Sequence, residues 1–199
     1  MTNDQPLTRE AILDAAEQAL RRYGPDKTSV VDVAKALQVS HGTLYRHFAS
    51  KAALREAVTE RWLRQCIAEP MEASAGSQPG TAAEQVRAWL SALAGAKRRY
   101  AAEDPEMFTM YAAVTQDAAE LVGRHVDRLI GQLASIIERG MQEGQFKRGD
   151  AKRAARAAFL ATSRFHHPAH GQEWLAVSAD EDFEAVVDLL LSGLVREQA

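Results

Sequence analysis

The sequence of 199 residues contains one cysteine, Cys66. A single cysteine excludes an intrachain disulfide and the class of small secreted domains that disulfides hold together. The sequence has no run of about 18 apolar residues, so we expect no membrane-spanning helix and no membrane partner. Its first residues, Met1–Pro6, are polar and lack the basic and apolar regions of a secretory signal. Together these absences predict a cytoplasmic protein.

The patterns of common catalytic and metal sites are also absent. There is no CxxC or HExxH motif, no glycine-rich phosphate loop, no pair of catalytic carboxylates and no Ser/His/Asp arrangement. His166, His167 and His170 lie close together, but adjacent residues on a helix point about 100° apart, which does not suit a metal. A helix end, where a protonated imidazole meets the helix dipole, explains them better. We expect no enzymatic activity, no cofactor and no metal.

The charge of the chain does not by itself indicate a nucleic-acid-binding protein, because the formal net charge is −3. The charge is unevenly distributed, however. Residues 40–55 contain Arg46, Lys51, Arg55 and two histidines, and no acidic residue. Binding to phosphates depends on the local charge. The sequence therefore predicts a small basic patch in this segment.

Apolar residues recur at helical spacing along the chain, and no segment shows the alternation of a strand. The pattern predicts an all-α fold of about nine helices. We expect Pro70 to end the fourth helix and Met71–Gly80 to form a loop. The helices are expected after Thr8, after Ser29, after Ser40, over 51–69, over 81–102, from Pro105, over 117–143, from Asp150 to about His167, and over 180–196.

Two short amphipathic helices follow each other closely near the start of the chain. The first has a capping box of Ser29 and Asp32, and the second turns Leu44 and Phe48 inward. The second helix places polar and aromatic side chains outward, with Gly42 leaving room for a close approach. This arrangement predicts a helix-turn-helix whose second helix enters the DNA major groove. The alternative, a surface helix of an ordinary bundle, needs no glycine there and rarely exposes a tyrosine.

The segments that carry this pattern resemble the TetR family of bacterial transcriptional regulators. They are Ser29–Leu37, the run VSHGTLYRHF at Val39–Phe48, Ser50-Lys51 and Leu54. The motifs cover roughly residues 8–60, and the rest resembles the family only in helix number, length and order. The resemblance implies a DNA-binding helix-turn-helix domain over 1–50, and a linking helix with a ligand-binding and dimerisation domain over 51–199. It also implies a homodimer that reads a near-palindromic operator in double-stranded DNA, usually a repressor released by a small-molecule effector.

The family's DNA contacts, carried over by position, fall on nine residues. We expect phosphate contacts from Ser29, Tyr45, His47 and Lys51. We expect base contacts from His41, Gly42, Thr43 and Arg46, although Arg46 suits guanine and phosphate equally. The ninth residue is Ser40, at the start of the recognition helix. Gln38 stands where the family usually has glycine, and a positive φ there would cost about 1 kcal/mol.

In the C-terminal part we expect the dimer interface on the last two helices, one rich in alanine and the other carrying Leu190, Leu191 and Leu194. The alternative is that these helices close the core of the monomer. Arg164 suits an acidic ligand group or, more simply, a salt bridge. Large side chains on the intervening helices suggest a ligand pocket, or simply core packing. They are Trp62, Trp89, Tyr100, Met107, Phe108, Tyr111, Phe159 and Phe165.

Other functions fit the same residues. A transcriptional activator or a regulator without a ligand has the same sequence features as a ligand-released repressor. A helical enzyme or carrier with a vestigial helix-turn-helix is a third interpretation, which none of the catalytic patterns supports.

Overall fold

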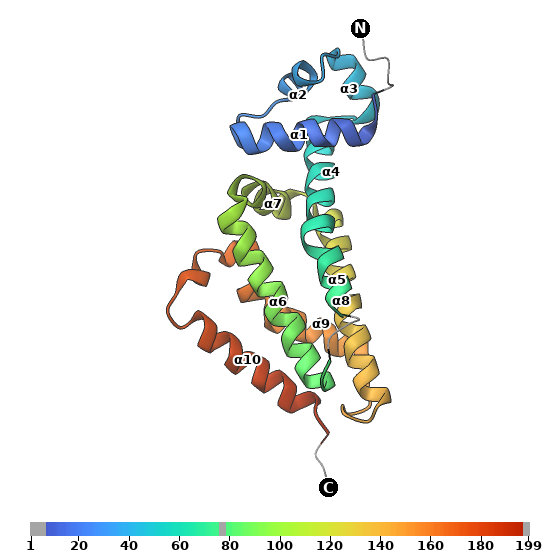
Figure 1. Cartoon of the computed structure of the whole chain (residues 1–199), viewed down its shortest axis with the longest axis vertical. Helices are drawn as coiled ribbons and strands as arrows, with labels where there is room; N and C mark the ends of the chain where they lie inside the picture. The colour runs from blue at the N-terminus through green and yellow to red at the C-terminus, as the bar shows by residue number, and fades with distance from the viewer. Residues whose placement is uncertain (1–6, 76–78, 197–199) are drawn as a thin grey trace. The chain divides into compact units, whose positions relative to one another are not determined.

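The computed structural model describes residues 7–75 and 79–196, and these form two compact units. Residues 7–62 and Asp104–Leu121 form one unit, here called the N-terminal unit (Figure 1). The described residues of 63–103 and 122–196 form the other, the C-terminal unit. In the described ranges the chain is helical apart from turns and one isolated antiparallel bridge between Phe146 and Val195. The predicted all-α fold is confirmed.

The N-terminal unit is built from local signals that the sequence displays. Its helices are α1 (Arg9–Tyr23), α2 (Val30–Ala36), α3 (His41–His47), most of α4 (Lys51–Leu63), and α7 (Pro105–Asp117). Thr8 and Ser40 cap α1 and α3 by accepting hydrogen bonds from backbone N–H groups three residues later. Buried apolar side chains from α1, α2 and α3 then form a core that holds α3 against its neighbours.

The turn before α3 contains one residue in a strained conformation. Gln38 has a φ of 55°, in the left-handed region that favours glycine. The sequence analysis considered this conformation, because the family usually has glycine at this position. The turn nevertheless forms, because the Val39 N–H donates to the Ala34 carbonyl at 3.0 Å.

The sequence predicted that the fourth helix ends at Pro70, but in the structure the helix runs past this residue. It continues from α4 through a π-helical turn (Arg64–Ala68) into α5 (Glu69–Ala75). Proline normally breaks a helix because it lacks an N–H and its ring strikes the carbonyl four residues earlier. The π-turn changes the bonding just before it, with the Glu69 N–H donating to the Arg64 carbonyl, and so accommodates the ring. Residues 71–75 of the predicted loop are helical, and 76–78 lie outside the described residues.

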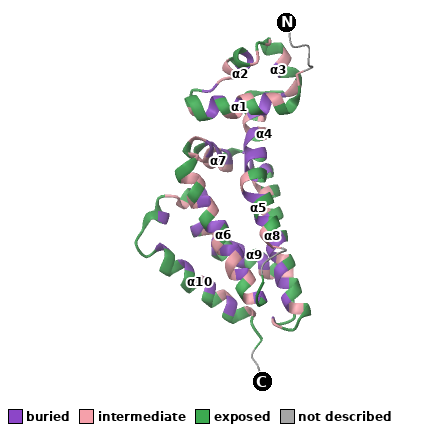
Figure 2. Ribbon diagram, viewed as in Figure 1, coloured by how far each residue is buried: buried purple, intermediate pink, exposed green. Residues whose placement is uncertain are grey.

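The C-terminal unit packs its own helices around a second core. They are α6 (Ala82–Glu103), α8 (Ala119–Gln142), α9 (Ala151–Ala161) and α10 (Ala179–Leu194). Buried residues recur along α6 at helical spacing, which Figure 2 shows as a broken purple line. Arg87 of α6 forms ion pairs with Glu184 and Asp188 of α10. α9 ends earlier than predicted, at Ala161, and short 3₁₀ turns follow it.

Candidate nucleic-acid interface

α2 and α3 form the predicted helix-turn-helix, with four residues between them. Leu44 of α3 and Phe48, which follows the helix directly, are buried, as the sequence predicted, so the opposite face of the helix points outward. Tyr45, on that outer face, is 50% exposed although it is a large aromatic side chain. A rigid exposed ring at this place is suited to an apolar contact with a thymine methyl group or to a phosphate contact through its hydroxyl.

Three predicted DNA-contacting residues of α3 are linked by hydrogen bonds. The hydroxyls of Ser40 and Thr43 lie 2.9 Å apart, and Arg46 Nη2 donates to Thr43 Oγ1 at 3.4 Å. These contacts hold a hydroxyl pair and a guanidinium side by side on the exposed edge of the helix. The guanidinium keeps other N–H groups for a base or a phosphate, because it has five donors in total. His41 and Gly42 are exposed in the first turn of the same helix.

Ser29 has a structural role that competes with the predicted phosphate contact. Its N–H and its Oγ–H both donate to Asp32 Oδ2, at 2.9 and 2.6 Å. These hydrogen bonds lower the pKa of the Asp32 carboxyl, because they stabilise its charged form. The Ser29 hydroxyl is therefore committed to the capping box in the free protein.

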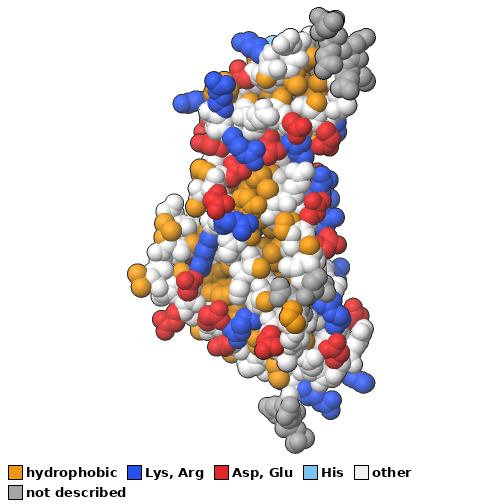
Figure 3. Space-filling model, viewed as in Figure 1, with side chains coloured by type: hydrophobic (Ala, Val, Ile, Leu, Met, Phe, Trp, Pro, Cys, Tyr) orange, Lys and Arg blue, Asp and Glu red, His pale blue; other side chains and the backbone are white. Residues whose placement is uncertain are grey.

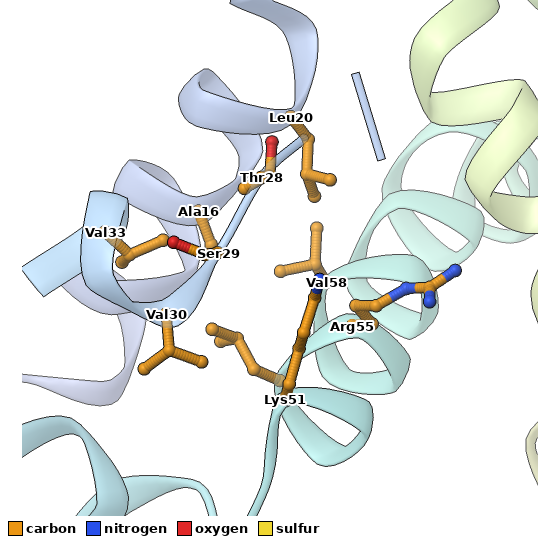
Figure 4. Close-up of a pocket in the computed structure, with 10 residues that line it drawn as sticks. Ala16, Leu20, Thr28, Ser29, Val30, Val33, Lys51, Arg55 and Val58 are labelled. Atoms are coloured by element: carbon orange, nitrogen blue, oxygen red, sulfur yellow. The ribbon is translucent and has the colours of Figure 1, made fainter. Parts of the chain in front are cut away.

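Ser29 and Lys51, from different helices, line the same small cavity. Figure 4 shows Ser29 at the start of α2, with Lys51 and Arg55 on α4 at the same cavity. The cavity volume is about 20 Å³, which suits a single water molecule but no effector. The face in Figure 3 carries acidic and basic side chains interspersed.

Sequence reasoning missed two arginines that hold this surface in place. Arg9 Nη1 donates to the His47 carbonyl at 3.2 Å, and its guanidinium lies 4.2 Å from the centre of the Phe48 ring. Arg61 of α4 is only 6% exposed and pairs with three carboxylates on α1, those of Glu10, Asp14 and Glu17. These acids recur once per helical turn, so they lie on one face of α1. This spacing could have indicated that a basic side chain packs against that face.

Half of the predicted ligand-binding residues lie in the N-terminal unit. Trp62 packs on Tyr111 with ring centres 6.1 Å apart, and Phe108 meets Tyr111 edge-on at 5.9 Å. Met107 is fully buried nearby in α7. The indole N–H of Trp62 donates to Asp104 at 3.2 Å. Burial raises the pKa of the Tyr111 hydroxyl.

The other half lies in the C-terminal unit, where Trp89, Phe159 and Phe165 are buried and Tyr100 is half-buried. Phe159 lies against His166 with ring centres 4.5 Å apart and the rings tilted by 49°, and Phe165 meets Phe183 at 5.3 Å. Trp89 lines a water-sized cavity of about 20 Å³. The structure therefore divides the eight residues between two cores.

The sequence left two partners open for Arg164, an acidic ligand group or a salt-bridge partner within the protein. In the structure Arg164 forms a salt bridge. Its Nε donates to Glu173 at 2.7 Å, and Glu173 also lies 2.6 Å from His170 Nδ1. In the parts of the chain that the structure describes, no group of three or more histidine, cysteine, aspartate or glutamate side chains is arranged to hold a metal ion. Over the same residues, no helix is both long and apolar enough to cross a membrane.

Comparison with known proteins assigns the chain to a family. A family model described as "Bacterial regulatory proteins, tetR family" matches residues 12–58. A second, described as "Tetracyclin repressor-like, C-terminal domain", matches residues 82–187, more than half of the chain. The chain belongs to the TetR family of bacterial regulatory proteins. It is a DNA-binding transcriptional regulator.

Individual relatives are more distant. The nucleoid occlusion factor SlmA of Marinobacter nauticus is 28% identical over 164 residues, 79% of this chain and 80% of that protein. The regulator TtgR of Pseudomonas putida is 38% identical over 53 residues, which span 27% of this chain and 25% of TtgR. The structure of a putative TetR-family regulator from Mesorhizobium loti has the same fold, with a TM-score of 0.70 at 20% identity, over 96% of this chain and all of that one.

Proposed function

We propose that the protein is a homodimeric repressor that binds a near-palindromic operator and leaves it when a small-molecule effector binds. In this proposal residues 1–50 read DNA, and residues 51–199 link, dimerise and bind the effector. The observation that carries it is the exposed face of α3, where Thr43, Tyr45 and Arg46 project from a helix anchored by Leu44 and Phe48. The protein acts in the cytoplasm, where such an operator lies, and catalyses no reaction.

The dimer in this proposal forms through α9 and α10. Leu160 of α9 and Leu189 of α10 are strongly exposed, Leu189 by 74%, whereas Leu191 is buried within its own chain. Leu190 and Leu194 are half-buried and have apolar surface left for a partner. Exposed leucines on these two consecutive helices support an interface, because their apolar surface is available for burial against a partner.

The small-molecule effector has support from a structural relative. The regulator FadR of Bacillus subtilis, solved in complex with stearoyl-CoA, has the same fold, with a TM-score of 0.63 at 22% identity, over 94% of this chain and 99% of that one. The aromatic and methionine side chains of both cores provide the apolar surroundings that such ligands need.

The DNA-binding part of the proposal is tested by selecting bound duplexes from randomised DNA at low salt. We expect the protein to enrich a palindrome, and Tyr45→Ala to lose that enrichment. Tyr23→Ala is the matched control, because Tyr23 is exposed to the same degree, 47%, but lies at the end of α1. Absence of any enriched sequence, or equal loss in both variants, would contradict the role given to α3.

The dimer is tested by measuring molar mass with light scattering. We expect a dimer for the unmodified protein and a monomer for the double variant Leu160→Asp and Leu189→Asp. The control Val31→Asp introduces the same charge on α2 and should leave the mass unchanged. A dimer that survives the double variant would place the interface elsewhere.

A further inference from the structure

A carboxylate from outside residues 1–50 is held against the first helix of the N-terminal unit. Asp104 lies within residues 82–187, which the C-terminal family model matches, but it belongs to the N-terminal unit. It is the N-cap residue of α7, and its side chain makes no capping hydrogen bond to that helix. An aspartate at an N-cap normally accepts such a bond. The carboxylate is therefore committed to contacts outside its own helix.

These contacts are made with α1 and α4. Arg21, in the last turn of α1, donates to Asp104 from Nε, 3.2 Å from each carboxylate oxygen, and from Nη2 at 2.9 Å. The indole N–H of Trp62 donates to the same carboxylate at 3.2 Å. A guanidinium that meets a carboxylate through two of its nitrogens fixes the orientation of both groups. Because the Asp104 side chain is only 15% exposed, solvent screens this contact less than it screens a surface ion pair.

Further contacts hold the same end of α1 in place. Glu17, one turn before Arg21, lies 2.7 Å from Arg21 Nη2 and 2.6 Å from Arg61 Nη2. Glu17 therefore bridges an arginine of α1 and the buried arginine of α4. Gly24, the C-cap of α1, approaches α7 so closely that a Cβ there would lie 3.0 Å from the Glu106 carboxylate. The C-terminal end of α1 is thus seated on α7 by charge pairing and by close packing.

The other end of α1 holds the end of α3, and Figure 1 shows α1 lying between α3 and α7. Arg9, the first residue of α1, donates to the carbonyl of His47, the last residue of α3, and its guanidinium lies over the Phe48 ring. The last carbonyls of a helix have no partner within it, so a cation there fixes the helix end. A helix as short as α3 depends on such neighbours for its position. Arg9 and Arg21 lie about 18 Å apart along α1.

We propose that Asp104 is a positioning residue for DNA binding: by fixing one end of α1, it keeps α3 at the other end in the orientation that binds DNA. α1 can transmit this constraint as a rigid body, because buried side chains anchor it from Ile12 to Leu20. A determinant of DNA binding therefore lies beyond residue 50. This inference rests on the DNA-binding role of α3 proposed above, and on neither the dimer nor the effector.

The decisive variant is Asp104→Asn, because electrostatics and positioning predict changes of opposite sign. Asparagine keeps the shape of the side chain and removes its negative charge. The loss of a negative charge by itself leaves the affinity for DNA unchanged or raises it. If Asp104 positions α3, the affinity falls instead, by at least about fivefold, the lower end of the usual coupling between two sites. Fluorescence anisotropy with the duplex enriched in the selection measures the affinity at fixed salt.

Glu103→Gln is the matched control. It removes the same charge from the neighbouring residue, which is exposed and pairs with Arg99 of its own helix. Because an exposed charge away from α1 is screened, the affinity of this variant should stay within about twofold of the unmodified protein. An Asp104→Asn variant that binds DNA as tightly as Glu103→Gln, or more tightly, would overturn the proposal.

Arg21→Met breaks the same contact from an exposed residue, whose replacement does not put the core at risk. Its control, Arg22→Met, removes an equal charge from the next residue, which lies over the Tyr23 ring. We expect Arg21→Met to bind DNA at least about fivefold more weakly than Arg22→Met. The double variant Arg21→Met and Asp104→Asn should lose less affinity than the product of the two single losses, because both break one contact. A loss equal to that product would show that the two residues act independently and would overturn the proposal.

Hydrogen exchange tests whether the effect passes through α3. In the protein without DNA, the amides of residues 41–48 should exchange faster in Asp104→Asn and in Arg21→Met than in the unmodified protein. They should be unchanged in the two controls. The amides of α8, in the C-terminal unit, should change less than those of α3, which distinguishes local release from global unfolding. Unchanged exchange of α3 in both variants would overturn the proposal.

The failure of this inference and that of the proposed function are distinguishable. If the unmodified protein binds no duplex, the DNA-binding role of α3 is contradicted, and the exchange measurement still decides whether Asp104 holds α3. If the protein binds its operator and Asp104→Asn leaves that affinity intact, the role of α3 stands and this inference is overturned.

Discussion

Replacing Lys97 with methionine should make the protein more stable, which is unusual for a change at a buried residue. The side chains have similar length and shape, but methionine carries no charge into the core. In the folded protein, burial lowers the Lys97 pKa from its ordinary value of 10.5 to about 7. Between these two pH values the unfolded chain binds a proton that the folded chain does not, so stability rises with pH across this window.

The size of the pKa shift of Lys97 determines how much the lysine lowers the free energy of unfolding. By proton linkage, Lys97 lowers the free energy of unfolding by about 4 kcal/mol at pH 7 and by about 2 kcal/mol at pH 9. Lys97→Met should remove this cost, so its gain over the unmodified protein should be about 2 kcal/mol larger at pH 7 than at pH 9. Lys97 also lowers the pKa of His125 and His166, but these histidines titrate below pH 7, so the difference between pH 7 and pH 9 is specific to Lys97.

Urea unfolding at pH 7 and pH 9 measures this difference, at one protein concentration because assembly also contributes to stability. Lys147→Met is the control and should change the free energy of unfolding by less than about 0.5 kcal/mol at both pH values. A gain that is the same at both pH values, or a loss of stability at pH 7, would refute the reasoning. The first result would mean that Lys97 keeps an ordinary pKa in the folded protein.

Three further predictions concern the N-terminal unit. Gln38→Gly should raise the free energy of unfolding by about 0.5–1 kcal/mol, because the residue has a positive φ; an unchanged urea midpoint would show that the turn carries no strain. Arg61→Met should lower stability by about 1–3 kcal/mol, because it leaves three carboxylates on α1 without their shared cation. Its control, Arg64→Met, removes an exposed ion pair and should cost less than about 0.5 kcal/mol; equal losses would contradict the importance of burial. Lys51→Ala should weaken binding to all duplexes and reduce the salt dependence of log affinity by about one unit, as expected for one lost phosphate contact; an unchanged slope would place Lys51 away from the backbone.

The helix-turn-helix was predictable because its signals are local. Ser29 and Ser40 act as caps within three residues of their partners, and Leu44 and Phe48 repeat at helical spacing. The positive φ of Gln38 was considered because the TetR family usually has glycine at this position, and the structure shows it. The same reasoning was wrong about the end of the fourth helix, because that end depends on more than a helix-breaking residue. Pro70 is accommodated because the turn before it changes to π-helical bonding, which no residue preference announces.

The sequence by itself determined the helical architecture and the face that α3 turns outward, because both follow from residue spacing over one or two turns. Only the tertiary structure decided which distant side chains meet. Arg61 lies at least 44 residues from the acids that it pairs with, and Lys97 becomes buried only when the C-terminal unit folds. Burial and charge pairing depend on packing between helices far apart in the chain, and they set the pKa values of the groups that meet there.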